Sequence, residues 1–491
     1  MGKHQYPCTR LDLETKLKAI VGRTLGEIDT AHVFKLTETN PKVTGIAGDV
    51  IEQSVIGYPP NSGQEPDLVV DGVEIELKTT GLKRASKGRG MEAKEPMSIT
   101  AVSIDTIASE EFKSSNFWHK VEHLLIVYYL YDSDTTVKAA DYALFPVKGY
   151  QFHEFDAEEI ETLANDWQLI HDFITDIQTR YHDDESRKRE YPRLSSSLRA
   201  NLMLIDTAPK YPHPPRVRLK RSTVTTIARK NFGDTMEQLP KDYTTYAAID
   251  AHCHKLAEEY SGRTVGDLAE EFGEPLTNKK TGRERKGIAE PLICKMFGGK
   301  ARKMSSIELF SKIGLRGKSI VLTKSGTRTE DMKLITIDFD QFEAGSVFEE
   351  SQIYEYFANN QLLCMVFEEP SANARLADNV FLGFKRIAFD TDFIEAETRR
   401  VWERIAYLIA SRKLVDVVDR DKNGNPKVNK TGVIRSAPNF PKAKDGAVFV
   451  RGTGDDSTLK PEIVNGIRMY KQQLWIKGSY IAARLRGADW L

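Results

Sequence analysis

Acidic residues and a lysine alternate with apolar residues in the stretch VVDGVEIELKTT, residues 69–80. Such alternation predicts a half-buried strand in which Glu76 and Lys78 share one face, because successive side chains point to opposite faces. Asp71-Gly72, just before it, predicts a type I′ hairpin turn, which needs positive φ at both central residues. The turn fixes the strand register and brings Asp67 opposite Glu76.

The predicted register determines which side chains meet across the hairpin. The pairs are Val70 with Val73, Val69 with Glu74, Leu68 with Ile75, and Asp67 with Glu76. Directly opposed residues have Cβ atoms roughly 5 Å apart, so two carboxylates would lie side by side on one face. Glu74 shares that face, but it lies opposite a valine, and we place it outside the site.

Two opposed carboxylates need a cation, because like charges directly opposite each other destabilise a sheet. No arginine within the run neutralises them. A hard divalent cation would do so, and Mg²⁺ is usually held by one or two carboxylates together with water and substrate phosphate. Lys78 would then stand beside the attacking water and the phosphate. The alternative is a solvated outer face on which Glu76 and Lys78 form an exposed charge ladder.

Length and composition indicate a globular protein with more than one domain. The chain has 491 residues, of which 40% are hydrophobic and 29% charged, and its net charge is −1. This length predicts two or three domains. A near-zero net charge neither requires nor excludes a nucleic-acid partner, because acidic surface elsewhere can balance a basic groove.

Cysteine usage and hydropathy indicate the compartment. The four cysteines lie far apart and fit no zinc spacing: Cys8, Cys253, Cys294 and Cys364. We expect reduced thiols in a cytoplasmic protein. His252 and His254 flank Cys253, but a metal role is disfavoured, because on a strand the cysteine would point away from both histidines. The longest apolar run, at 123–131, is far shorter than the roughly 20 residues of a membrane span and predicts a buried core strand.

Segments of the first half of the chain recur in the second half in the same order. The matching pairs are GRTLGEI (22–28) with GRTVGDL (262–268), GIAGDVIEQSVIG (45–57) with GIAEPLICKMFGG (287–299), LLIVYYLYD (124–132) with LLCMVFEEP (362–370), NDWQLIHDFI (165–174) with RVWERIAYLI (400–409), and RLKRSTVTTIAR (218–229) with WIKGSYIAARL (475–485). This predicts two copies of one fold, residues 1–233 and 250–491, joined by a polar linker at 234–249.

The second copy lacks the carboxylates of the first. The aligned pairs are Glu52 with Cys294, Glu76 with Leu309 and Lys78 with Ser311, the last two from matching Gly81-Leu82 to Gly314-Leu315. Loss of all of them in one copy, and retention of all in the other, indicates that they work as a unit in the first copy.

Five motifs follow one another in the first copy: GRTLGEI, VIEQSVIG, Asp67 followed by Glu76-Leu77-Lys78, His119-Lys120 before an apolar strand, and RLKRSTVTTIARKNFG. In this order and spacing they resemble the MutH endonuclease of mismatch repair. The doubled length resembles the larger type II restriction endonucleases of that family, which cut at GATC.

The resemblance implies an α/β fold of two tandem restriction-endonuclease-like PD-(D/E)xK domains, each a mixed sheet flanked by helices, the second copy being degenerate. It also implies that Glu52, Asp67 and Glu76 hold Mg²⁺ and that Lys78 and Lys120 complete the catalytic set. Hydrolysis would leave a 5′-phosphate and a 3′-hydroxyl.

Basic residues near the end of the first copy are candidates for DNA contacts. The resemblance places a base-reading loop within residues 191–201, where Arg193 or Arg199 could make bidentate contacts to guanine. A phosphate contact or a solvated side chain is the alternative. Residues 216–230 contain six basic residues and no acidic one, a pattern typical of a solvated helix face or of phosphate contacts beside a cleft. The candidates there are Arg218, Lys220 and Arg221. MutH has a tyrosine at the position of Arg218, so its methylation sensitivity is not carried over.

The leading hypothesis is an Mg²⁺-dependent type II restriction endonuclease that makes sequence-specific double-strand breaks, with the second copy as a silent DNA-binding effector. A methyl-directed mismatch-repair nicking endonuclease and a catalytically silent DNA-binding protein are the alternatives. The expected partners are double-stranded DNA and, without direct contact, a cognate DNA methyltransferase. We expect no membrane association, and a monomer that loops or dimerises on DNA.

Overall fold

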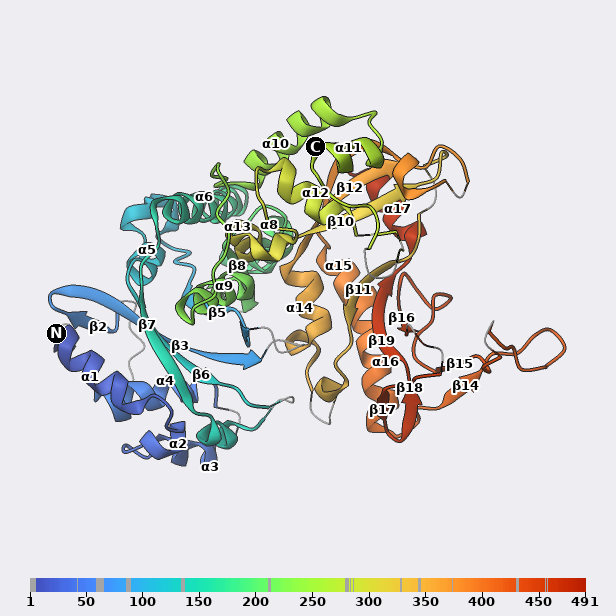
Figure 1. The fold of residues 1–491 in the computed structure, drawn as a ribbon. Helices are drawn as coiled ribbons and strands as arrows, with labels where there is room; N and C mark the ends of the chain where they lie inside the picture. Colours follow the sequence, from blue (N-terminus) through green and yellow to red (C-terminus); the bar gives the residue numbers. More distant parts are fainter. Residues whose placement is uncertain are drawn as a thin grey trace. The chain divides into compact units, whose positions relative to one another are not determined.

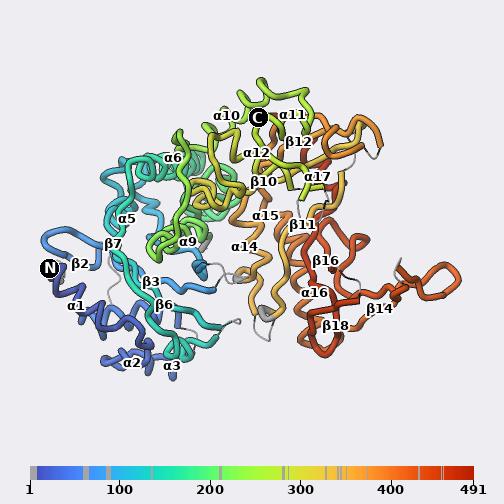
Figure 2. Tube along the Cα trace, in the orientation of Figure 1, coloured from blue at the N-terminus to red at the C-terminus, as the bar shows by residue number. Residues whose placement is uncertain are grey.

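The computed structural model describes residues 6–41, 43–58, 66–84, 90–133, 137–210, 213–278, 282, 284–285, 287–326, 329–342, 346–372, 374–429, 432–454, 456 and 458–491. These residues form two compact units (Figure 1). Unit 1 contains those up to 133, 137–249 and 305–314, and unit 2 contains 250–304 and 315–491. Each unit has a hydrophobic core of its own, and the path of the chain is traced in Figure 2.

The central sheet of unit 1 carries the predicted hairpin in its middle. In spatial order its strands are β1 (Tyr6–Cys8), β2 (Leu68–Val70), β3 (Val73–Arg84), β6 (Leu124–Leu130) and β7 (Val147–His153), and β4 (Met91–Ala93) pairs with the end of β3. The β1–β2 and β3–β6 pairs are parallel, whereas β2–β3, β3–β4 and β6–β7 are antiparallel. Every residue of β6 is buried, as its apolar run predicts.

The hairpin has the predicted register, with Leu68 opposite Ile75 and Val69 opposite Glu74. Asp71 and Gly72 have φ values of +49° and +88°, as a type I′ turn requires. The prediction of a half-buried strand is wrong for the middle of β3, where three consecutive residues, 75–77, are all buried. Other elements cover both faces there, so the charged face of the strand does not lie in solvent.

Helices surround the two sheets of unit 1. The helices are α1 (Arg10–Ile20), α2 (Leu25–Ile28), α3 (Leu36–Thr39), α4 (Ile46–Val50), α5 (Asn116–Val121), α6 (Ala157–Arg180), α7 (Asp184–Glu190), α8 (Leu194–Leu198), α9 (Arg221–Asn231) and α13 (Glu308–Ile313). The second sheet has the order β5 (Met97–Ala101), β9 (His213–Leu219), β8 (Ile205–Lys210). Side chains from α1, α2 and α4 pack on Ile75 and Leu77 of β3 in one core.

The repeated GRT motif has a local structural cause. In unit 1, Thr24 caps α2 and Glu27 returns the hydrogen bond to the cap residue, which forms a capping box. In unit 2, Thr264 and Asp267 form the same box at α11 (Val265–Glu271). Both motifs therefore begin a helix in the same way.

Unit 2 contains two three-stranded sheets and two small hairpins. Its strands are β10 (Leu315–Leu322), β12 (Gln361–Glu368) and β13 (Val380–Ile387) in one sheet, β11 (Met332–Thr336), β19 (Lys471–Ile476) and β16 (Val448–Thr453) in the other, and the hairpins β14 (Asp416–Val418) with β15 (Ser436–Pro438) and β17 (Glu462–Val464) with β18 (Ile467–Met469). Its helices are α11, α12 (Ala289–Met296), α14 (Gln352–Asn359), α15 (Thr391–Phe393), α16 (Arg399–Ala410) and α17 (Gly478–Gly487), and α10 (Tyr246–Tyr260) starts in unit 1 and continues into unit 2.

Strand pairing in the two units follows one pattern. The parallel pair β3–β6 followed by antiparallel β7 has its counterpart in parallel β10–β12 followed by antiparallel β13. The antiparallel sheet β5–β9–β8 likewise has its counterpart in β11–β19–β16. The last strand of the chain in each second sheet, β9 or β19, leads directly into a helix, α9 or α17.

This pattern corrects the alignment of Glu76 with Leu309 and of Lys78 with Ser311. Residues 308–313 form helix α13, so they cannot correspond to a strand. Glu76 pairs with Leu124 of β6, and Arg316 pairs with Leu362 of β12, the residue that the repeat matches to Leu124. By the strand register, therefore, the counterparts of Glu76 and Lys78 are Arg316 and Lys318.

Helix α13 belongs to unit 1 although its sequence lies in the second half of the chain. Its Lys312 is buried against Glu159 and Glu308, and Lys230 of α9 also contacts Glu308, at 2.6 Å. The segment 234–249, expected to be a linker, is also part of unit 1. Charged side chains thus fix a piece of the second repeat in the first unit.

Some remaining expectations concern thiols and membranes. All four cysteines are free, and all but Cys8 are buried. His252, Cys253 and His254 lie on helix α10 and not on a strand. None of the helices in the described part of the chain has the length and apolar character that crossing a bilayer requires.

Asp166 of α6 organises the chain before β8. Its buried carboxylate accepts hydrogen bonds from the backbone N–H groups of Met203, Leu204 and Ile205 at 2.7, 2.8 and 3.1 Å. We predict that Asp166→Asn lowers the free energy of unfolding by about 3 kcal/mol, because an amide N–H₂ would face backbone donors. Urea denaturation followed by tryptophan fluorescence measures this. Asp172→Asn, at an exposed position of the same helix, is the control and should change it by less than about 0.5 kcal/mol. An unchanged unfolding midpoint for Asp166→Asn would contradict the role.

Candidate active site

The hairpin β2–β3 brings Asp67 to the middle of the sheet. Asp67 immediately precedes β2, and the β2–β3 register continues to it from the Leu68–Ile75 pair. Its Oδ2 accepts a hydrogen bond from the backbone N–H of Leu77 at 3.0 Å. This bond fixes the carboxylate next to Glu76, as the predicted opposition of the two residues requires.

Glu76 is held by two lysines. Its Oε1 lies 2.5 Å from Nζ of Lys78, and Nζ of Lys120 lies 3.1 and 3.0 Å from its two carboxylate oxygens. The side chain of Glu76 is 2% exposed, whereas Lys78 and Lys120 are 19% and 8% exposed. A buried carboxylate with two ammonium partners is electrostatically satisfied, and of the two lysines Lys78 is the more accessible.

Lys120 reaches Glu76 because α5 ends where β6 begins. Ser115 caps α5 by accepting a hydrogen bond from the N–H of Trp118 at 3.1 Å. The N–H of Glu76 donates to the carbonyl of His123 at 3.0 Å, and the parallel pairing with β6 starts at this point. The helix and the strand that follows it therefore place Lys120 over the same position of β3.

Glu52 lies on a π-helical turn, Ile51–Ile56, that continues α4. Turns of this kind inside helices frequently occur at functional sites. Burial raises the pKa of Glu52 to about 7, and the carboxylate of Asp67 is the next largest cause. Burial and then Glu76 raise the pKa of Asp67 to about 6. The three carboxylates therefore lie close enough to repel one another, and repulsion of this kind is relieved by a cation.

The donor set suits a hard divalent cation, because all three side chains offer oxygen. No group of three or more His, Cys, Asp or Glu side chains within the described ranges is arranged as a finished metal site. The reason at Glu76 is visible in its contacts, since both carboxylate oxygens are engaged by lysines. Asp67 and Glu52, whose pKa values are raised by burial, are the carboxylates that gain most from an added cation.

The candidate DNA contacts are mostly engaged with other protein groups. Arg193 contacts Glu190, and Arg218 makes a bidentate pair with Asp206 at 2.9 and 2.7 Å. Lys220 is buried and donates to the carbonyl of Leu202. Two further candidates complete the set: Arg221, which contacts Glu92 at 3.4 Å, and Arg199, the C-cap residue of α8.

The segment 216–230 is not one basic helix face, as the sequence led us to expect. It divides into β9 and α9, and in α9 the cations Arg229 and Lys230 pair with Asp234 and Glu308. Of the six basic residues, Arg216 is exposed and has no carboxylate partner in the part of the chain that the structure describes. The acidic partners come from distant segments, so the sequence of this segment alone could not reveal them.

Comparison with known proteins agrees with the geometry. The family model of the DNA mismatch repair enzyme MutH matches residues 56–166. The type II restriction enzyme Sau3AI of Staphylococcus aureus is 21% identical over 408 residues, which are 80% of this chain and 79% of that protein. The predicted resemblance to MutH-like restriction endonucleases is confirmed. The MutH match includes Asp67, Glu76, Lys78 and Lys120, whereas Glu52 lies just before it.

The triad of Glu76 with its two lysines predicts a measurable stability effect in this MutH-like unit. Lys120→Met should lower the free energy of unfolding by about 3 kcal/mol, because it removes one partner of a buried carboxylate. Lys18→Met, which removes the exposed partner of Glu14 at 3.1 Å, should cost less than about 1 kcal/mol. Chemical denaturation of both variants provides the comparison.

A double variant tests the electrostatic reason. Adding Glu76→Gln to Lys120→Met should restore part of the lost stability, because the carboxylate left without Lys120 is neutralised. Additive losses in the double variant would mean that Lys120 stabilises the unit through packing instead.

Proposed function

We propose that the chain is a type II restriction endonuclease that cuts both strands of DNA at a specific sequence in an Mg²⁺-dependent reaction. The observation that carries the proposal is the buried cluster of Asp67, Glu76, Lys78 and Lys120 at the centre of the β3 sheet, with the raised pKa of Asp67. A solvated charge ladder, the alternative for this face, is at odds with the 2% exposure of Glu76.

Each side chain has a role that follows from its position. Asp67, Glu76 and Glu52 would hold Mg²⁺, which when bound activates water and stabilises negative charge on the scissile phosphate. Lys78, the more exposed lysine, orients the attacking water or takes its proton, and its charge faces the phosphate. Lys120 keeps Glu76 in place from the buried side. The products would be a 5′-phosphate and a 3′-hydroxyl.

The recognition sequence that we propose is GATC, by the resemblance to the large MutH-like restriction enzymes. A cognate DNA methyltransferase would protect the host DNA without contacting this chain. A mismatch-repair nicking enzyme has the same chemistry but needs only one copy of the fold, and the presence of unit 2 therefore favours restriction.

Unit 2 is proposed to be a degenerate copy that binds DNA without cutting it. Arg316 and Lys318 stand where the strand register of unit 1 has Glu76 and Lys78. Arg316 is exposed, and Lys318 donates to the carbonyl of Lys333 at 3.4 Å. Two cations in place of a carboxylate and a lysine cannot hold a metal ion, but they can contact phosphate.

The carboxylates can be tested by substitution. Asp67→Ala and Glu76→Ala should abolish plasmid cleavage in Mg²⁺ and leave DNA binding nearly intact, because each removes a metal ligand and lessens repulsion of the phosphate. Lys78→Ala should also be inactive but retain metal binding. EDTA should stop the wild-type reaction, and excess Mg²⁺ should restore it.

Glu74→Ala is the matched control, since Glu74 lies on the same strand opposite Val69 and should retain cleavage. Cleavage by both Asp67→Ala and Glu76→Ala at more than about a tenth of the wild-type rate would refute the assignment.

The role of unit 2 can be tested on plasmids. We predict that a plasmid with two recognition sites is cut faster than one with a single site, and that an uncleavable oligonucleotide carrying the site accelerates the slow substrate. The full chain is the material for this experiment, because residues 305–314 belong to unit 1 and a fragment of residues 250–491 would lack their packing surface. Equal rates without acceleration would mean that unit 2 only strengthens the grip on one site.

A further inference from the structure

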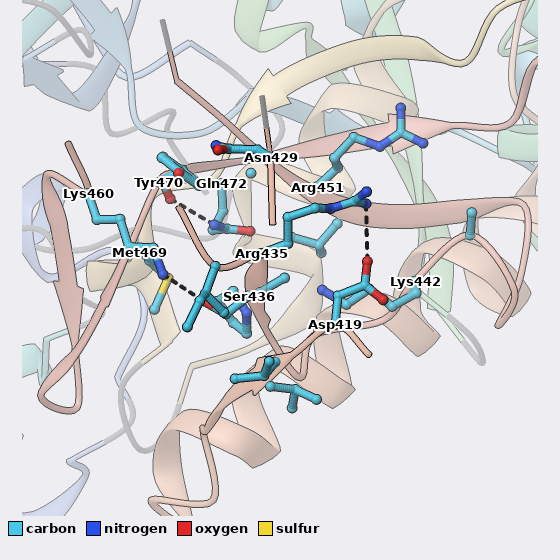
Figure 3. A pocket seen from close by; sticks show the side chains of 18 of the residues that line it. Asp419, Asn429, Arg435, Ser436, Lys442, Arg451, Lys460, Met469, Tyr470 and Gln472 are labelled. Atoms are coloured by element: carbon cyan, nitrogen blue, oxygen red, sulfur yellow. Dashed lines mark hydrogen bonds and ion pairs between the residues drawn. The ribbon is translucent and has the colours of Figure 1, made fainter. Parts of the chain in front are cut away.

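A cavity of about 1010 Å³ lies in unit 2 beside β16, β19 and the segment around Lys442 (Figure 3). Among its described lining residues, six cations face one carboxylate, that of Asp419. The cations are Arg420, Arg435, Lys442, Lys444, Arg451 and Lys460. This excess of positive charge in a concave site favours an anionic ligand.

Two of these cations have no anionic partner of their own. Arg435 pairs with Asp419 at 3.2 Å, Arg451 pairs with Asp331 at 2.6 Å and Lys460 pairs with Asp416 at 3.2 Å. Lys442 and Lys444, by contrast, lie within ion-pair distance of no carboxylate in the described segments of the chain. Lys442 is half-buried, and burial lowers its pKa. An ammonium group withdrawn from water in this way gains most from a bound anion.

An arm of residues 415–439 forms one side of the cavity. Its base is the β14–β15 pair, and above it the backbone of Asp419 pairs with both Arg435 and Lys427, which makes two short hairpins. Figure 1 shows the β14 and β15 strands leading into a loop that projects from the rest of unit 2. In unit 1 the corresponding stretch, between α6 and β8, is formed by α7 and α8 instead.

The arm exposes apolar side chains next to basic ones. Val415, Val417, Val428 and Ile434 are 49%, 52%, 58% and 52% exposed. Arg420, Lys422 and Lys427 lie on the same arm. Apolar groups held on a projecting ribbon gain free energy only when a partner covers them.

We infer that the arm and the cavity of unit 2 form one DNA-binding element, in which Lys442 and Lys444 hold backbone phosphates and the arm enters a groove. The inference rests on the proposed function. The charge of the cavity matches the phosphate backbone, and the major groove, about 12 Å wide, admits a two-stranded ribbon. The exposed valines and Ile434 then contact sugars, base edges and thymine methyl groups.

The phosphate contacts can be counted by the salt dependence of binding. Full-length protein carrying Asp67→Ala keeps DNA uncut while fluorescence anisotropy follows binding of a duplex at several salt concentrations. K442Q/K444Q should reduce the slope of log K against log salt by about 2, since each phosphate contact contributes about 0.9. Lys444→Gln alone, at an exposed position, should reduce it by about 1. K255Q/K303Q, which removes two exposed lysines of unit 2 outside the cavity, should leave it unchanged.

The arm has its own test. V428S/I434S should weaken binding of the duplex at least several-fold without changing the salt slope, because apolar contacts release no counterions. An unchanged slope for K442Q/K444Q and Lys444→Gln would overturn the inference. So would a V428S/I434S variant that loses self-association in sedimentation but binds DNA as before. If the wild type cuts plasmid while the slopes do not change, only this inference fails, whereas absence of cleavage by the wild type refutes the proposed function.

Discussion

The burial of Glu76 between two ammonium groups is the constraint on which the candidate site depends. A carboxylate that is 2% exposed is stable as an anion only if its partners are fixed. Lys78 is fixed by the strand, and Lys120 is fixed by the transition from α5 to β6. The hairpin turn, the parallel β3–β6 pair and the cap of α5 are therefore parts of one arrangement that positions the cluster.

Asp67 and Glu52 stand in the opposite electrostatic situation. Burial and mutual repulsion raise both pKa values, and their printed neighbours include no lysine at bonding distance. The site thus combines one satisfied carboxylate with two strained ones, a distribution typical of functional sites. The two lysines organise the site around Glu76, and the two strained carboxylates provide the driving force for taking up a cation.

The sequence predicts what is local. The Asp71-Gly72 turn determines the β2–β3 register within a few residues, and the apolar run at 124–130 gives the buried strand β6, so both expectations are confirmed. The burial of β3 was missed, because the elements that cover it are distant in sequence. The pairing of Arg218 with Asp206 was missed for the same reason, although the two residues are direct cross-strand neighbours in β8–β9. No signal in the segment itself marks Glu308 as the partner of Lys230.

The alignment error at 309–311 has a physical explanation that also bears on how the repeat diverged. In the first half the chain reaches β3 through a hairpin that carries Asp67, and in the second half it reaches β10 through helix α13. That helix packs in unit 1, where Lys312 and Glu308 are buried with Glu159 and Lys230. The second copy could not keep a carboxylate at the position of Asp67 once this segment had become a helix of the other unit. Replacement of Glu76 by Arg316 removes a second ligand at the next element, so the loss of metal-binding capacity and the attachment of the second copy to the first follow from the same change in the chain.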